Sequence, residues 1–285
     1  MSFANYLKQK QCSPATIHTY EKYRGYLMEW LAKENLAAKS LTYTELLDFI
    51  RYLTGIGKSK PSIHNQLCVV RHYCNYLIGE NQRSDNPAAG VFIKGLIRKL
   101  PSGLLSTEAM QELYNQYNLQ LHVDASKKIM LGLMIHQGIT VGELMRLESK
   151  HIQLRDAKIV IKGTRRTNER LLNLHAHQML SIKQYLDKNK FKEGPLFIEA
   201  LKREVSRRNV NNRIQYMFRQ LKQLNKKVIN AKQLRSSVIT HWLKQHNLRQ
   251  VQYMAGHKYV SSTERYQLNH LDDLKTAIQE HHPMS

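Results

Sequence analysis

The chain has 285 residues, and its 44 Lys and Arg against 22 Asp and Glu give a formal net charge of +22. This length allows two domains that each bury a core. So large a positive charge indicates a polyanionic partner, either nucleic acid or an anionic membrane surface. No stretch approaches the roughly 18 consecutive apolar residues that a membrane-spanning helix needs, and the N-terminus lacks the apolar region of a secretory signal. We therefore expect a cytoplasmic protein without a membrane partner.

Residues 1–98 have the pattern of a compact bundle of about four helices. Apolar side chains recur at helical spacing, and the predicted starts carry capping signals: Ser13 before Pro14, the capping box from Thr42 to Glu45, and Pro61. The pattern ends at Asn86-Pro87. A basic stretch at 94–103, rich in residues that resist helix, predicts a linker to a second domain over residues 99–285.

The second domain is predicted to be mostly helical with one small sheet. A helix capped by Ser106 is expected to run through Leu113, and another is expected from Ala125 to His136. Two strand-like runs, 158–162 and 170–174, flank a polar, basic turn and predict a β-hairpin. The later helices are apolar on one face and basic elsewhere. The fold class predicted for the whole chain is thus mainly α, with a mixed α+β second domain.

The usual signatures of nucleotide and metal chemistry are missing from the sequence. There is no phosphate-binding Gly-rich loop and no H-E-x-x-H, and the few acids are dispersed rather than clustered. The three cysteines, Cys12, Cys68 and Cys74, do not have metal-ligand spacing. We expect no cofactor and no metal ion, so positive side chains would have to supply the electrostatic part of any chemistry on a polyanion.

A set of polar residues near the C-terminus has a specific spacing. Lys232 precedes Arg235 by three residues, Gly256 precedes His257, and Tyr266 lies nine residues after that histidine. This segment resembles the second catalytic box of the tyrosine site-specific recombinases, the phage-type integrase family with its lambda-integrase, Xer and Cre group. The family pattern is H-x-L-R, then L-G-H, then the tyrosine. Here Lys232 occupies the position of the family's first histidine.

The resemblance covers nearly the whole chain. The segment from Lys162-Gly163 to Arg170 resembles the family's hairpin with its catalytic lysine, and Gly138 to Leu144 resembles the first catalytic box. The opening S-x-x-T-I-x-x-Y at Ser13 and the closing Asn86-Pro87 resemble the family's core-binding domain. The resemblance implies a helical, SAM-like core-binding domain over residues 1–98 and a catalytic domain over residues 99–285.

The resemblance also implies a role for each matched residue. Tyr266 would attack a DNA phosphodiester and form a 3′-phosphotyrosine bond. Arg235, Lys232 and His257 would stabilise the negative charge that develops on the phosphate. Lys162 would protonate the leaving 5′ oxygen as general acid. The chain would then be a site-specific recombinase or integrase that needs no cofactor.

Thr140 departs from the family pattern, because the family has its first catalytic arginine at this position. Losing one such donor typically costs on the order of 10²–10³ in rate. Some conjugative-transposon integrases of the family also lack this arginine, and here Lys127, Lys128 or Arg146 is a candidate substitute. The alternative is a catalytically impaired relative that binds DNA as an accessory or regulatory protein. A relaxing enzyme similar to type IB topoisomerases is a third reading.

The expected partner is double-stranded DNA that carries specific recombination sites, bound by a homo-tetramer at the bacterial nucleoid. Candidate DNA contacts come from three basic regions: the start of a helix at Lys60, the hairpin turn at Arg165 and Arg166, and the basic segment with Lys202, Arg203, Arg207, Arg208 and Arg213. A C-terminal helix over 271–280 is expected to dock either on a neighbouring subunit or on its own domain.

Overall fold

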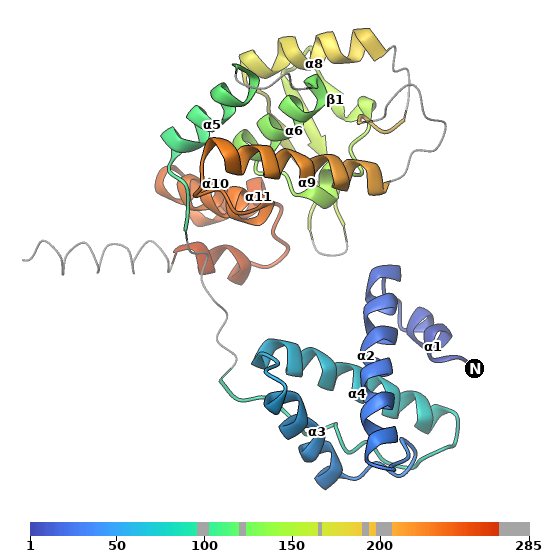
Figure 1. Cartoon of the computed structure of the whole chain (residues 1–285). Helices are drawn as coiled ribbons and strands as arrows, with labels where there is room; N and C mark the ends of the chain where they lie inside the picture. The colour runs from blue at the N-terminus through green and yellow to red at the C-terminus, as the bar shows by residue number, and fades with distance from the viewer. Residues whose placement is uncertain (96–102, 120–123, 165–166, 190–193, 198–206, 268–285) are drawn as a thin grey trace, which may run out of the picture. The chain divides into compact units, whose positions relative to one another are not determined.

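The computed structural model describes residues 1–95, 103–119, 124–164, 167–189, 194–197 and 207–267. The chain divides into two compact units, Met1–Arg98 and Lys99–Ser285, which are drawn in Figure 1. Within the described ranges, no helix combines the length and the apolar character that crossing a membrane requires.

The first unit contains four described helices: α1 (Phe3–Gln9), α2 (Pro14–Lys33), α3 (Tyr43–Gly55) and α4 (Lys60–Gly79). The predicted caps form, since the Ser13 side chain accepts a hydrogen bond from the backbone of Thr16, and Thr42 and Glu45 make a reciprocal capping box. Helices α2, α3 and α4 enclose a core that includes Leu27, Trp30, Phe49, Leu67 and Val70. The sequence did not lead us to expect α1, which packs Phe3 and Leu7 on α4.

The second unit is built around the buried helix α6 (Ala125–His136). Seven consecutive residues of α6, from Ile129 to Ile135, are buried. Helices α5 (Thr107–Leu119), α8 (Ala176–Asn189), α9 (Arg207–Leu224) and α10 (Ala231–Gln245) all contact it. The short helix α7 (Val141–Leu144), a 3-10 turn (Ser149–His151) and α11 (Leu248–Ala255) complete the named helical elements, and residues 261–267 are also helical.

A three-stranded antiparallel sheet lies in the same unit, in the order β1 (Ile152–Gln153), β2 (Lys158–Ile161) and β3 (Arg170–Asn173). Strands β2 and β3 form the predicted hairpin, with Ile159 opposite Leu172. The short strand β1 was not predicted. The prediction of a mainly helical fold, with a helical first domain and a small sheet in the second, is confirmed.

The end of one helix differs from the prediction. Helix α5 continues to Leu119, where the sequence suggested an end near Leu113. The predicted C-terminal helix over 271–280 lies outside the described residues.

Candidate active site

Arg235 lies on the first half of α10, and the fold holds its guanidinium from two sides. It donates hydrogen bonds to the carbonyl of Gly138, just after α6, and to the carbonyl of Ala255, at the end of α11. Its side chain is 11 % exposed. Burial lowers the pKa of Arg235, and the nearby Glu143 carboxylate opposes that shift. The site therefore contains a buried cation. Backbone carbonyls at the ends of two helices hold its guanidinium in place, and its other N–H groups stay available as donors.

His257 follows α11 directly and contacts the other matched residues. Its Nδ1 lies 2.8 Å from the hydroxyl oxygen of the buried Thr263. Its ring stacks on the Tyr266 ring, with 6.0 Å between centroids and 12° between planes. Burial, then Arg235 and Arg170, lower the pKa of His257 to about 4. The imidazole is therefore neutral at neutral pH, and it can donate one hydrogen bond from Nε2 if Thr263 donates to Nδ1.

Tyr266 lies on the helical segment 261–267, where it is half-buried against the core of the second unit. Its phenol interacts electrostatically with Arg235, in addition to its stacking on His257. The fold thus brings together three residues that are separated by up to 31 positions in the sequence. A tyrosine hydroxyl, a fixed arginine and a neutral imidazole are groups that phosphoryl transfer to a tyrosine can use.

The carboxylate of Glu143 connects this site to its support. It accepts two hydrogen bonds from Arg170, at 2.6 and 3.1 Å, and both side chains are almost fully buried. It also accepts from the Thr140 hydroxyl at 2.8 Å and from the Thr140 backbone at 2.9 Å, and it lies 4.0 Å from Arg235. Burial raises the pKa of Glu143, but the bonds and charge of Arg170 outweigh burial and hold it below the usual value.

Gly256 is required by the close approach of Arg170. Its φ of +66° is the left-handed value that ends α11. A Cβ atom at this position would lie 2.6 Å from Nη1 of Arg170 and 3.1 Å from the carbonyl oxygen of Asn168. The glycine before His257 therefore allows the backbone at the end of α11 to lie against the buried arginine.

The β2–β3 hairpin is attached to the same backbone. The amide of Asn168 donates to the carbonyl of Gly256 at 2.9 Å, and Thr167 pairs with His257. Lys162, the predicted general acid, lies just after β2 and donates to Glu169 at 3.0 Å, with both side chains more than half exposed. Lys232 is exposed in the first turn of α10, three residues before Arg235.

The three candidate substitutes for the missing arginine have different surroundings. Lys127 lies over the ring of Tyr216 at 4.8 Å. Lys128 donates to the carbonyl of Tyr114 and lies 3.7 Å above its ring, and burial lowers its pKa to about 8. Arg146 is exposed. It lines a cavity of about 470 Å³ together with Lys150 and Lys162.

The predicted DNA contacts are only partly described. Lys60 is exposed at the start of α4. Arg213 is largely buried in an ion pair with Asp124, so its charge serves the contact between α9 and the start of α6. Arg207 and Arg208 lie in the first turn of α9. Four further candidates lie outside the described residues: Arg165, Arg166, Lys202 and Arg203.

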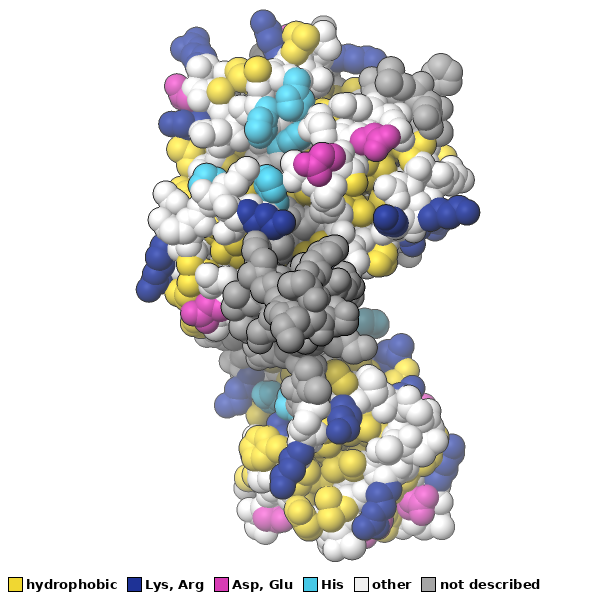
Figure 2. Space-filling model, turned by 90° about the vertical axis from the view of Figure 1, so that its left-hand side faces the viewer, with side chains coloured by type: hydrophobic (Ala, Val, Ile, Leu, Met, Phe, Trp, Pro, Cys, Tyr) yellow, Lys and Arg dark blue, Asp and Glu magenta, His cyan; other side chains and the backbone are white. Residues whose placement is uncertain are grey.

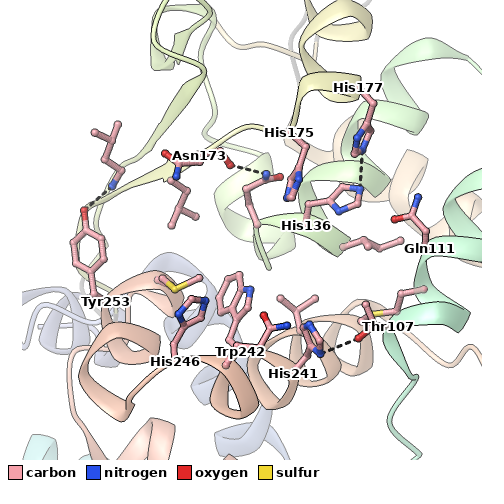
Figure 3. Close-up of a pocket in the computed structure, with 18 residues that line it drawn as sticks. Thr107, Gln111, His136, Asn173, His175, His177, His241, Trp242, His246 and Tyr253 are labelled. Carbon is pink, nitrogen blue, oxygen red and sulfur yellow. Dashed lines mark hydrogen bonds between the residues drawn. The ribbon is translucent and has the colours of Figure 1, made fainter.

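Two side-chain arrangements of this unit were not predicted from the sequence. The Glu143–Arg170 pair was not expected, although the T-x-x-E spacing from Thr140 to Glu143 is a capping-box signal that marks the carboxylate. The other is a cavity lined by several histidines between α5, α6, α8, α10 and α11 (Figure 3). Its histidines lie in three separate regions of the sequence, around positions 136, 175–177 and 241–246, so no local spacing groups them.

Comparison with known proteins supports the family resemblance that the sequence motifs indicate. Residues 104–273 match the model of the phage integrase family, and residues 1–81 match the phage integrase N-terminal SAM-like domain. Tyrosine recombinase XerC of Escherichia coli O127:H6 is 27% identical over 269 residues, which cover 93% of this chain and 88% of that protein.

Solved structures show the same fold. The XerH site-specific recombinase bound to its palindromic difH substrate in a post-cleavage complex gives a TM-score of 0.70 at 19% identity, covering 92% of this chain and 78% of that one. The Tn1549 transposon integrase in complex with a circular-intermediate DNA gives 0.65 at 14% identity, covering 93% and 95%.

Proposed function

Because the chain belongs to the phage integrase family, we propose that it is a site-specific DNA recombinase that cuts and rejoins DNA through a covalent bond to Tyr266. The observation that carries this proposal is the meeting of Arg235, His257 and Tyr266 in one site. The XerC relative is itself a tyrosine recombinase, and the XerH structure is a complex with DNA after cleavage. The substrate is double-stranded DNA that carries specific recombination sites.

The reaction exchanges one phosphoester for another. The Tyr266 oxygen attacks the phosphorus, its proton leaves to solvent, and the bond to the 5′ oxygen breaks as Lys162 gives that oxygen a proton. Arg235 and Lys232 neutralise the negative charge that grows on the non-bridging oxygens, and neutral His257 donates a hydrogen bond to one of them. The number of phosphoester bonds is unchanged, so rejoining requires no nucleotide cofactor.

Arg146 is the substitute that best fits the missing first arginine. The side chain of Thr140 is committed to the Glu143 capping box and has no charge. Lys127 and Lys128 are engaged with Tyr216 and Tyr114. Arg146 instead lines the same cavity as Lys162, so its guanidinium and the general acid would reach one phosphate group.

Strand exchange would require four copies of the chain on two duplexes, with each copy supplying one Tyr266. The net charge of +22 supports wide contact with the DNA backbone, at the nucleoid of a bacterial cytoplasm. Recombination of this kind serves both mobile elements and host chromosomes, so the chemistry alone does not identify the biological task. A non-catalytic DNA-binding accessory protein is the second candidate, and the neutral Thr140 side chain is the observation that favours it.

A strand-exchange assay tests the proposal. Two duplexes taken from DNA that flanks the gene, with different end labels, are incubated with the protein. The recombinase predicts products that join the two labels, and the Tyr266→Phe variant should give none. Relaxation of supercoiled DNA without exchange would indicate a topoisomerase-like enzyme, and tight binding without either product would indicate the accessory protein.

A further inference from the structure

The second unit contains a cavity of about 620 Å³ whose polar lining is dominated by imidazoles. Its histidines come from α6, the start of α8, α10 and the turn before α11: His136, His175, His177, His241 and His246. No Asp or Glu is among its lining residues. Histidine side chains also gather on one face of this unit in the space-filling view (Figure 2).

Two of these histidines face each other closely. The Nε2 atoms of His136 and His177 lie 3.2 Å apart, and their ring centroids are 4.8 Å apart at 71° (Figure 3). Two ligands of a tetrahedral zinc ion, each about 2.05 Å from the metal, have nitrogens about 3.3 Å apart. The two nitrogens share a hydrogen bond, and the same spacing suits two ligands of one ion. The ring of His175 lies 4.8 Å from that of His136.

The residues that follow the two histidines, Gln137 and Gln178, hold the backbone of the pair in place. Gln137 and Gln178 exchange two amide hydrogen bonds, at 2.9 and 3.0 Å, and both are buried. This amide pair locks the end of α6 to the start of α8 without any ligand. An ion that binds the two imidazoles would therefore have little rearrangement to drive.

We propose that His136 and His177 bind one first-row transition-metal ion, such as Zn²⁺ or Ni²⁺, through their Nε2 atoms. No group of three or more His, Cys, Asp or Glu in the described part of the chain is arranged to hold a metal ion, so water in the cavity completes the coordination. The imidazole that donates the present hydrogen bond takes the tautomer with its proton on Nδ1. Two nitrogens and no carboxylate select against Mg²⁺ and Ca²⁺.

The position of the ion links it to the active site. His136 lies two residues before Gly138, whose carbonyl accepts a hydrogen bond from Arg235. An ion at the pair would tie this end of α6 to α8 more firmly. The ammonium of Lys128 acts against the ion, because its charge is felt by both imidazoles.

Titration calorimetry of the full-length chain with ZnCl₂, and separately with NiCl₂, tests the site. The wild type should show one site that His177→Ala weakens by about tenfold or more. Because His177 is exposed, this substitution leaves the core intact. The Lys128→Met variant should bind more tightly, since a like charge is removed.

The controls separate this pair from the other histidines. The variants His241→Ala and His246→Ala change the same cavity and should keep the site, as should His281→Ala/His282→Ala near the C-terminus. The proposal is overturned if His136→Ala and His177→Ala both bind as wild type, or if binding is lost only when the C-terminal histidines are replaced.

Discussion

At the scale of single residues, Thr140 has a structural role: it caps α7. An arginine at this position would need to fill the same role in addition to binding the phosphate. Its hydroxyl and backbone amide both bind the Glu143 carboxylate and begin α7. The same carboxylate neutralises Arg170. The capping box of Thr140 and Glu143 therefore forms without a charge at position 140. In the proposed recombinase, a neighbouring side chain would supply the positive charge that Thr140 lacks, and Arg146 is the exposed candidate that lines the same cavity as Lys162.

Replacing Arg146 by Ala tests this assignment. We expect cleavage to slow by a factor on the order of 10²–10³, because one donor to the transition state is lost, while DNA affinity changes little. Lys127→Ala, which removes a cation held over Tyr216, is the matched control and should cleave nearly normally. Single-turnover cleavage of a labelled duplex measures both rates. Equal rates for the two variants would exclude Arg146 as the substitute.

Gly256→Ala should damage both stability and activity. The added methyl group meets the Arg170 guanidinium at 2.6 Å in a left-handed backbone, so we expect a loss of about 2 kcal/mol or more in the free energy of unfolding. Gly142→Ala is the control, since the nearest atom to its Cβ would be 3.9 Å away. Urea unfolding of both variants gives the comparison, and similar stabilities would show that the close approach is unimportant.

At the scale of elements, the sequence predicted those features that depend on local chemistry. Capping residues marked the starts of α2 and α3, and α6 has the predicted bounds of Ala125 and His136. Alternating apolar residues on both sides of a polar turn predicted the β2–β3 hairpin. The spacing of Arg235, His257 and Tyr266 predicted that they share a site, because this spacing carries the family resemblance.

Features that depend on contacts between distant segments were not predictable from local patterns. The Glu143–Arg170 pair joins residues 27 positions apart, and His136 meets His177 across 41 positions. Lys128 and Arg146 were equivalent candidates in the sequence. The structure distinguishes them. The packing of α6 against α5 places Lys128 against Tyr114, whereas Arg146 is exposed. The short elements α1 and β1 have too few residues for a periodic signal.

The buried ion pair between Glu143 of α7 and Arg170 of β3 is expected to matter far more for the free energy of unfolding than an exposed ion pair does. Glu143→Gln leaves the Arg170 charge buried without its counter-ion and should cost about 3–5 kcal/mol of unfolding free energy. Lys150→Ala breaks an exposed pair with Glu148 and should cost less than about 1 kcal/mol. Chemical denaturation distinguishes the two. Comparable small losses would mean that the carboxylate does not support the site.

At the scale of the whole molecule, burial of neutral histidines makes stability depend on pH. The pKa values of His136 and His257 are lowered to about 4 by burial and nearby cations, against about 6.5 in an unfolded chain. Between these values the unfolded chain binds more protons than the folded one. Stability is therefore complete above about pH 6.5 and is lost as the pH falls toward about 4.

The expected slope is at most about 1.4 kcal/mol per pH unit for each histidine. Urea unfolding at several pH values between about 7 and about 4.5 measures it. The His136→Gln variant should show a smaller slope, because the contribution of His136 to the pH dependence is removed. A free energy of unfolding that does not change over this range, or an unchanged slope in the variant, would contradict these pKa shifts.

The most direct measurement of the central claim is to locate the covalent bond between protein and DNA. The protein is incubated, without a crosslinker, with nicked duplexes taken from DNA that flanks the gene. The denatured adduct is digested, and the modified peptide is sequenced by mass spectrometry. Our account predicts one nucleotide-bearing peptide, with the 3′ phosphate on Tyr266, and no adduct with Tyr266→Phe. An adduct on another residue, or DNA bound tightly but never covalently, even by Thr140→Arg, would contradict it.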